Sequence, residues 1–325
     1  MSDAKTVAKR GPSPPPPSVW ITGQRDGHAQ LAHGEYIGDT ALDQDRIPPA
    51  LAAYAITHYT HPGALVLDPD CGAGTVLVEA LRAGRHAVGL TTHHRYWELA
   101  RANLTTTKHA GAWPDGMVLE DTPTTQTDRT DHLTGLTGRV DLILTTPRHH
   151  TPSLAHTRPP DLDPLGTLTR ALLRCRGLLH PGGHVVITLP PQRHHGQLLD
   201  LTRGTMAAGH AAGLLAVERC VALLAELRGI RIITRASLAQ RRAAAQHQRL
   251  TGHPITLTAH HDVLVFRAPE SAEQIVTKLT TAAAGLDTHL SRDDNTGHPL
   301  GGSGLKYTTT HRHVAASSMF RREAA

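Results

Sequence analysis

The chain has 325 residues, of which 39% are hydrophobic and only 3% aromatic, and its formal net charge is +5. This length allows one α/β domain with tails, or two small domains, and the aliphatic composition favours the core of a buried parallel sheet. Its three cysteines lack a Cys-x-x-Cys spacing, which gives no support for a zinc ribbon or a disulfide framework. No apolar stretch reaches transmembrane length and the proline-rich start differs from a signal peptide, so we expect a cytoplasmic protein without a membrane partner.

In chain order, the sequence predicts a disordered proline-rich arm at 1–18, a short apolar stretch at 19–22 that fits an edge strand, and a loop to Gln44. Strands are then expected at 64–69, 86–90, 117–120, 140–145, 184–189, 214–227 and 262–266. Helices are expected at 51–60, 76–83, 95–104, 165–179, 198–212, 237–250 and 271–284, and a turn at 180–183. This alternation predicts one doubly wound α/β domain at 19–268, with a mostly parallel sheet and a flexible tail at 269–325.

The most informative stretch is Val66–Thr75, which reads Val-Leu-Asp-Pro-Asp-Cys-Gly-Ala-Gly-Thr. An apolar strand ends in Asp-Pro, a glycine-rich turn follows, and a helical pattern begins directly after the turn. Glycines let the backbone come close to a ligand, and the start of the helix offers free N–H groups. The stretch therefore predicts a nucleotide-like ligand at the end of this strand.

Residues 48–103 resemble the S-adenosylmethionine (SAM) site of DNA amino-methyltransferases of the N4-cytosine and N6-adenine type and of related RNA methyltransferases, including tRNA guanine-N2 enzymes. Those families carry Asp-Pro-Phe-Cys-Gly-Ser-Gly-Thr where this chain has residues 68–75. Residues 48–63 resemble their helix before the sheet, and 84–90 and 95–104 match the next strand and helix. The resemblance implies a class I methyltransferase fold, Rossmann-like, with seven strands, an antiparallel last strand, and SAM as the cofactor.

The resemblance also implies which residues border the cofactor: Asp68, Pro69, Cys71, Gly72, Gly74, Thr75, Thr91 and Asp121. Asp68 and the glycines would border its methionine and ribose parts, although Asp68 also fits a cap of the following helix. Thr91 stands where the families place an acid for the ribose hydroxyls, and it offers one hydrogen bond instead of a charge-assisted pair. The pair Glu120-Asp121 fits the contact to the adenine amino group, and equally a solvated loop.

The catalytic candidates follow the strand at 140–145 and are Thr146, Pro147 and His149. In the families this motif accepts hydrogen bonds from the target amino group and stacks an aromatic ring on the extruded base. Thr146 stands where the cytosine-N4 enzymes have Ser, and Pro147 is retained. Arg148 replaces a second proline and His149 replaces the aromatic residue. Either side chain can still stack on a base. Alternatively, the site is decayed or repurposed. When His149 is protonated, it and Arg148 would place two cations close to the sulfonium.

The resemblance implies a SAM-dependent methyltransferase that acts on an exocyclic amine of a nucleic-acid base, in DNA rather than tRNA. A catalytically degenerate protein that binds SAM or nucleic acid without turnover is the alternative, and a small-molecule acceptor stays open. The region 228–254 is the candidate for phosphate contacts, and it would look the same as a solvated basic face; its arginines are Arg231, Arg235, Arg241, Arg242 and Arg249. The 25 histidines fit compositional bias better than a metal site, and we expect no metal.

Overall fold

The computed structural model describes residues 17–120, 131–148, 164–194 and 197–270. All of them belong to the unit Met1–Ser271, and the second unit, Ala272–Ala325, lies outside the described residues. The predicted arm before residue 17, the predicted helix at 271–284 and the tail therefore lie outside them as well, and the boundaries of the domain at 19–268 stay a prediction.

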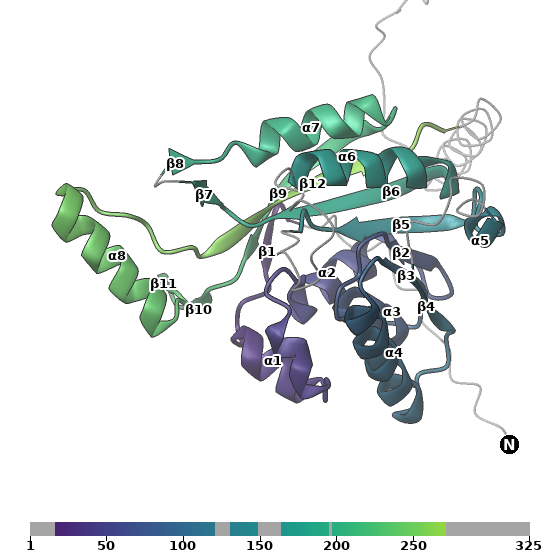
Figure 1. Cartoon of the computed structure of the whole chain (residues 1–325), viewed down its shortest axis with the longest axis horizontal. Helices are drawn as coiled ribbons and strands as arrows, with labels where there is room; N and C mark the ends of the chain where they lie inside the picture. The colour runs from purple at the N-terminus through teal and green to yellow at the C-terminus, as the bar shows by residue number, and fades with distance from the viewer. Residues whose placement is uncertain (1–16, 121–130, 149–163, 195–196, 271–325) are drawn as a thin grey trace, which may run out of the picture. The chain divides into compact units, whose positions relative to one another are not determined.

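The centre of the fold is one sheet of eight strands (Figure 1). The strands follow one another in space as β1 (Val19–Ile21), β9 (Leu215–Leu223), β12 (His260–Arg267), β6 (Leu179–Leu189), β5 (Val140–Thr145), β2 (Leu65–Asp68), β3 (His86–Thr91) and β4 (Gly116–Glu120). Strand β12 is antiparallel to both of its neighbours, and every other pair is parallel. The predicted parallel sheet with an antiparallel last strand is confirmed, and the apolar stretch at 19–22 adds an eighth strand at the edge.

Helices cover both faces of this sheet, which separates two hydrophobic cores (Figure 1). One face carries α2 (Pro49–Tyr59), α3 (Thr75–Arg82) and α4 (His94–His109), and the other α6 (Pro164–Cys175) and α7 (Leu201–Ala211). Leu77 of α3 is buried in the first core, and Leu172 of α6 is buried in the second. Two short elements, α5 (Asp131–Thr134) and η2 (Arg176–Leu178), flank β5 and β6 in the sequence.

Three local predictions were wrong. The expected loop to Gln44 contains α1 (Gly27–His33), which Asp26 caps by accepting a hydrogen bond from the Ala29 N–H, and η1 (Gly38–Leu42). The expected turn at 180–183 lies inside β6, where the register shifts, so that the turn residues form a bulge in the strand. The expected strand 214–227 ends at Leu223, because the chain there leaves the sheet.

An arm leaves the sheet after β9 and returns at the start of β12 (Figure 1). It consists of the antiparallel pair β10 (Glu226–Arg228) and β11 (Arg231–Ile233), and of α8 (Leu238–Thr251). A second small pair, β7 (Arg193–His194) and β8 (Gln197–Leu198), follows β6. Ser237 and Gln240 form a capping box at the start of α8. None of the residues of α8 is buried, so this helix is held by its cap and its connections and not by the core.

The carboxyl ends of β2, β3, β5 and β6 meet at one edge of the sheet because these strands are parallel. The chain proceeds outward from β2 to β3 on one side, whereas β5 lies on the other side of β2. Such a reversal of strand order opens a crevice at the carboxyl ends, which is where open α/β sheets bind their ligands. Among the described helices, none has the length and apolar character needed to cross a bilayer.

Candidate functional site

The glycine turn, residues 68–75, links the end of β2 to the start of α3. The Cys71 N–H donates to the Leu90 carbonyl at 2.8 Å, which ties the turn to β3, and the Gly74 N–H donates to the Cys71 carbonyl at 2.8 Å. Gly72 and Gly74 have φ angles of +47° and +82°, in the left-handed region where side chains are strained. The predicted turn is therefore formed, and its glycines are required by its backbone conformation.

Side chains from other elements lie directly against this turn. A Cβ atom on Gly72 would lie 2.3 Å from Oδ2 of Asp43 and 2.5 Å from the guanidinium nitrogens of Arg148. A Cβ atom on Gly74 would lie 2.9 Å from the Cβ of Ala100. Only residues without a Cβ atom fit at these two positions, and we call the turn together with the side chains packed against it the cradle.

Asn103 fastens the segment before the sheet over the glycine turn. Its Nδ2 donates to the Ala73 carbonyl at 2.9 Å and to Oγ1 of Thr40 at 2.8 Å, and its Oδ1 accepts from the Ile37 N–H at 2.9 Å. These bonds are buried or partly buried, so each is protected from water. Sequence reasoning assigned Asn103 no role; an amide on the buried face of a helix is the signal that was available.

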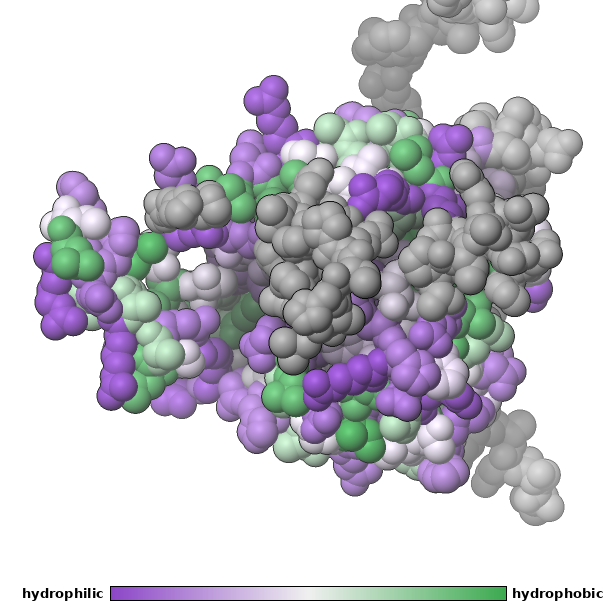
Figure 2. All heavy atoms as spheres, viewed as in Figure 1, coloured by the Kyte–Doolittle hydropathy of each residue, from purple (hydrophilic) through white to green (hydrophobic). Residues whose placement is uncertain are grey.

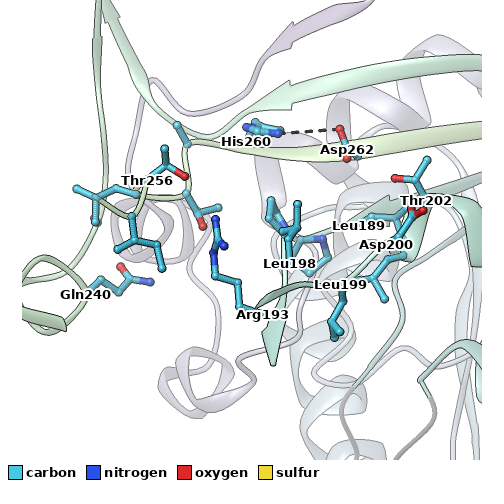
Figure 3. A pocket seen from close by; sticks show the side chains of 18 of the residues that line it. Leu189, Arg193, Leu198, Leu199, Asp200, Thr202, Gln240, Thr256, His260 and Asp262 are labelled. Atoms are coloured by element: carbon cyan, nitrogen blue, oxygen red, sulfur yellow. Dashed lines mark ion pairs between the residues drawn. The ribbon is translucent and has the colours of Figure 1, made fainter. Parts of the chain in front are cut away.

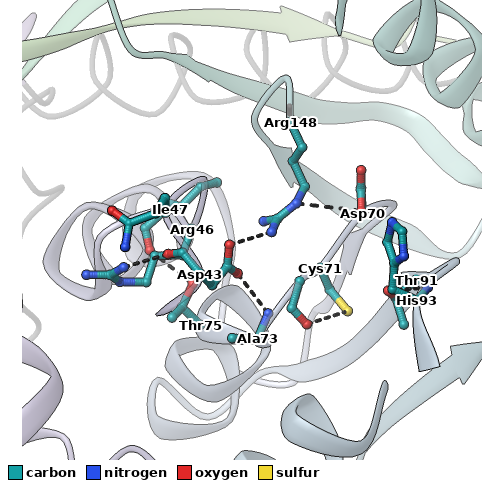
Figure 4. A network of polar contacts seen from close by, with 12 residues as sticks. Asp43, Arg46, Ile47, Asp70, Cys71, Ala73, Thr75, Thr91, His93 and Arg148 are labelled. Carbon is teal, nitrogen blue, oxygen red and sulfur yellow. Dashed lines mark hydrogen bonds and ion pairs between the residues drawn. The ribbon is translucent and has the colours of Figure 1, made fainter. Parts of the chain in front are cut away.

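Asp43, Arg148 and Asp70 form a charged network over the turn (Figure 4). Nη2 of Arg148 donates to Oδ1 of Asp43 at 2.5 Å, Nε of Arg148 lies 3.8 Å from Oδ1 of Asp70, and the Ala73 N–H donates to Oδ2 of Asp43 at 2.9 Å. Only 6% of Arg148 and 1% of Asp43 is exposed. Burial alone would lower the pKa of Arg148, but the Asp43 and Asp70 charges outweigh it and raise the pKa, so the guanidinium stays charged.

This network overturns two expectations about Arg148. Its side chain is buried and turned back onto the glycine turn, so it is not a platform on which a base stacks; the ring closest to it is Tyr96, 5.3 Å from ring centroid to guanidinium carbon. Two carboxylates also balance its charge, so Arg148 adds no uncompensated cation beside a sulfonium. His149 lies outside the described residues.

Asp68 ends β2 at the point where the strand order reverses. It is buried, and the Asp70 N–H donates to its Oδ1 at 3.1 Å. Burial raises the pKa of Asp68 to about 7; the bond from Asp70 N–H opposes this rise and the Asp70 charge adds to it.

The other predicted residues of the turn are also buried. Pro69 is buried between Asp68 and the turn. Burial raises the pKa of the Cys71 thiol, which leaves Cys71 to act through its backbone. Thr75 starts α3, and its hydroxyl donates to the Ile47 carbonyl at 3.0 Å.

Thr91 ends β3, where the sequence lacks the acid that the resembling families carry. It is buried, and its Oγ1 accepts from the His93 N–H at 3.3 Å. In the register of β3 and β4, Glu120 lies opposite Thr91, and its Oε2 lies 3.3 Å from Nδ1 of His94. A carboxylate therefore does stand at this end of the site, on the neighbouring strand. Asp121, the residue that we predicted there, lies outside the described residues.

Thr146 and Pro147 leave the end of β5, and both are buried. The Thr146 hydroxyl donates to the Thr188 carbonyl on β6 at 2.9 Å. A hydroxyl that already donates its hydrogen to a carbonyl still has lone pairs that can accept a hydrogen bond. Thr146 can therefore accept from an amine at the carboxyl edge of the sheet.

A groove opens beside this point, between the segment after β6 and the arm (Figure 3). It has a volume of about 1190 Å³ and begins at Leu189, the residue after Thr188. Its lining includes Arg193, Leu198, Gln240, Thr256 and His260. Figure 2 shows the corresponding hollow between α8 and the body of the molecule. The groove therefore begins one residue after Thr188, whose carbonyl accepts from Thr146, while Thr146 is not among its lining residues.

The arginines of the arm fall into two groups. Arg235 pairs with Glu226 at 2.8 Å, and Arg241 donates to the carbonyls of Thr234 and Ala236, so these two hold the arm together. Arg231, Arg242 and Arg249 are exposed. At 3.6 residues per turn, Arg242 and Arg249 project from one face of α8, opposite the face that carries Gln240 and His247 in the groove.

Comparison with known proteins finds a match for the first part of the chain. Residues 3–102 match the family model of DNA methylases, and this stretch includes the glycine turn, Asp43 and Thr91. A protein of Escherichia coli (strain K12) named "Putative methylase YubD" is 36% identical over 55 residues. That match covers 17% of this chain and 24% of the relative, so the chain spans about a quarter of the relative's length.

The solved structures that superpose on this chain have low sequence identity to it. Precorrin-6y C5,15-methyltransferase from Geobacter metallireducens superposes with a TM-score of 0.45 at 11% identity, covering 77% of this chain and all of that chain. TrmN from Thermus thermophilus gives 0.38 at 17%, covering 68% and 49%, and magnesium protoporphyrin IX methyltransferase from Synechocystis with bound SAM gives 0.39 at 12%, covering 74% and 82%. No function is transferred from these structures. The chain therefore combines a Rossmann-like α/β sheet and a glycine turn with a stretch, residues 3–102, that matches the family model of DNA methylases.

Proposed function

We propose that this protein is a SAM-dependent methyltransferase whose acceptor is an exocyclic amine of a nucleic-acid base. The observation that carries this proposal is the cradle: a left-handed glycine turn at the end of β2, fastened by Asn103 and closed by Asp43 and Arg148. The turn and Asp43 lie within residues 3–102, which match the DNA methylase model, whereas Asn103 and Arg148 lie beyond them.

The residues present fit SAM. The left-handed turn at Gly72 and Gly74 would bring the backbone to the methionine and ribose parts, and Asp68 stands at the reversal of strand order. Thr91 and Glu120 offer polar groups to the nucleoside end. When bound, the cofactor would supply an electrophilic methyl group on a sulfonium; the protein's part is to hold that group in line with the acceptor nitrogen and to exclude water.

We propose that the acceptor side, the part of the site that binds the amine to be methylated, begins at Thr146. Its lone pairs and the Pro147 carbonyl would accept hydrogen bonds from the amine, which orients the nitrogen lone pair toward the methyl group. The groove that starts at Leu189 offers a route to this point for a base turned out of its stack. The face of α8 that carries Arg242 and Arg249 would contact phosphates of the same nucleic acid, on the side away from the groove.

A transfer assay tests this proposal. The full chain is incubated with SAM carrying a tritiated methyl group and, separately, with unmethylated DNA, tRNA and a metabolite extract. We expect label in DNA, and loss of labelling in Gly72→Ala. Label in tRNA alone would replace DNA by RNA as the acceptor, and label in metabolites alone would overturn the nucleic-acid proposal.

A binding protein without turnover is the second candidate. Two observations favour it: β3 ends in Thr91 instead of an acid, and Arg148 stands in place of the second proline of the family motif. This candidate predicts SAM binding in calorimetry together with no label in any fraction.

A further inference from the structure

The network of Asp43, Arg148 and Asp70 has the chemistry of a site for an α-amino acid. We propose, on the basis of the proposed function, that Arg148 binds the carboxylate of the cofactor's methionine part and that Asp43 binds its ammonium group. This inference goes beyond the glycine turn, because it assigns recognition to two side chains that come from outside the cofactor motif.

The first support is position. Both guanidinium nitrogens of Arg148 would lie 2.5 Å from a Cβ on Gly72, and Oδ2 of Asp43 would lie 2.3 Å from it. The two charged groups therefore lie at the place where the turn brings its backbone closest to other atoms (Figure 4). A ligand that lies along Gly72 meets these two groups before any others of the network.

The second support is the placement of buried charge. Burying two charges costs more desolvation than an ion pair usually returns, so a pair such as Asp43 and Arg148 is poorly explained by stability alone. The Ala73 N–H and Arg148 hold Asp43 from two sides, and Asp70 lies on the other side of Arg148. The charges are thus fixed in direction before a ligand arrives, which reduces the ordering that binding requires.

The third support is charge complementarity. The network holds one cation between two carboxylates, a formal charge of −1. The methionine part of SAM carries a carboxylate, an ammonium and a sulfonium, a formal charge of +1. A guanidinium recognises a carboxylate with paired N–H donors, and Nη1 of Arg148 lies beside Gly72 while its Nη2 and Nε face Asp43 and Asp70. On binding, the ligand would replace the contact between Asp43 and Arg148. Its carboxylate would then pair with Arg148 and its ammonium group with Asp43.

This assignment explains the substitution in the strand-four motif. Arg148 replaces a proline there, which by sequence alone fits a decayed site. In the structure the same residue reaches the glycine turn and pairs with Asp43 in the segment before the sheet. Arg148 is then a cofactor-binding residue and not a remnant of a stacking residue.

Calorimetry with two ligands tests the proposal on the full chain. S-adenosylhomocysteine (SAH) has the amino-acid part, whereas 5′-methylthioadenosine has the same nucleoside without it. We expect Arg148→Gln and Asp43→Asn to weaken SAH binding about tenfold or more, the loss of one charge-assisted bond, and to leave 5′-methylthioadenosine within about twofold. Arg95→Gln is the matched control, because Arg95 of α4 also pairs with an aspartate of the segment before the sheet, Asp39 at 3.4 Å, but is exposed.

A wild-type measurement keeps the proposal testable if the variants do not fold. Decarboxylated SAM lacks only the carboxylate, and it should bind wild-type protein about tenfold more weakly than SAM. Equal affinity would overturn the proposal, as would an Arg148→Gln variant that binds SAH more tightly or loses both ligands equally. If wild-type protein binds SAH no more tightly than 5′-methylthioadenosine, this inference alone is overturned. If wild-type protein binds none of these ligands, the proposed function is overturned as well.

Discussion

Arg148 and Asp43 are 105 residues apart in the sequence and form a buried ion pair, 2.5 Å from Nη2 to Oδ1, over Gly72. Arg148 follows β5, and Asp43 lies in the segment before the sheet. The pair therefore joins the segment after β5, where we propose that the acceptor binds, to the segment that packs over the glycine turn. A change at either end is expected to alter the other.

The first prediction concerns the stability that depends on this pair. Asp43→Asn should lower the free energy of unfolding by about 3–5 kcal/mol, because it leaves the Arg148 charge buried with one partner fewer. The double variant Asp43→Asn with Arg148→Gln should lose less than the sum of the single losses. Urea denaturation measures all three values.

The control for this prediction is Asp39→Asn, which breaks the exposed pair with Arg95. It should cost about 0.5 kcal/mol or less. If Asp43→Asn costs no more than Asp39→Asn, the buried pair does not have the role given to it here.

The strands of the sheet could be predicted from the sequence because the residues that determine each strand lie within it or next to it. Each strand is an aliphatic run, and each glycine or proline that bounds it acts within a few residues; the strand 140–145, for example, was predicted with the limits observed for β5. The turn at 180–183 was misplaced because turn residues also form bulges, and only the pairing of β6 with β5 distinguishes the two.

The site was only half predictable for a related reason. The glycine turn is contiguous, so its motif is visible in the sequence. Asp43, Asn103 and Arg148 act through contacts across 30 to 105 residues, which leave no periodic pattern. Whether Arg148 turns toward a base or toward the turn depends on the backbone after β5, which the residue types do not determine.

The second prediction concerns Asn103. Asn103→Leu removes three hydrogen bonds and leaves buried groups of Thr40 and Ala73 without their partner. The free energy of unfolding should fall by on the order of 3 kcal/mol, and SAH binding should weaken because the turn is no longer fastened. Thr106→Val on the same helix is the control, since the Thr106 hydroxyl bonds only to the carbonyl of Ala102. Equal effects of the two changes in denaturation and calorimetry would show that Asn103 has no special role.

The third prediction follows from the raised pKa of Asp68, about 7 in the folded protein. An ordinary carboxyl in the unfolded chain has a pKa near 3.8. Between these values the folded protein holds a proton that the unfolded chain releases, so this residue makes stability fall as pH rises from about 4 to about 7. Asp68→Asn should not show this fall.

Urea denaturation of both proteins across that range measures the difference. The comparison with the variant is needed because His261, whose pKa burial lowers to about 4, contributes in the opposite direction. Since ionised Asp68 adds negative charge beside the cradle, SAM should also bind wild-type protein more tightly above about pH 7, and the variant should not. Parallel stability curves for the two proteins would refute the assignment.

The fourth prediction concerns nucleic-acid binding by the arm. Arg242→Gln with Arg249→Gln should weaken binding to all sequences alike and reduce the salt dependence by about one unit of slope for each arginine that no longer binds a phosphate. Arg170→Gln with Arg176→Gln removes the same charge from exposed positions on α6 and η2 and should have little effect. Fluorescence anisotropy at several salt concentrations distinguishes the two pairs. Equal losses would mean that net charge, and not the face of α8, governs binding.

Binding of SAH to Gly72→Ala, measured by calorimetry, tests the cradle most directly. Gly63→Ala is the matched variant, because Gly63 has a φ of +84° with nothing within 4 Å of a Cβ, whereas a Cβ on Gly72 would meet Asp43 and Arg148. Both changes place alanine in the left-handed region, which costs about 1–2 kcal/mol of stability, and the clash with Asp43 and Arg148 adds a further cost in Gly72→Ala alone. We predict that wild type and Gly63→Ala bind SAH and that folded Gly72→Ala gives no binding heat. Binding of SAH to Gly72→Ala with the affinity of Gly63→Ala, or no binding to wild type, would contradict the cofactor site described here.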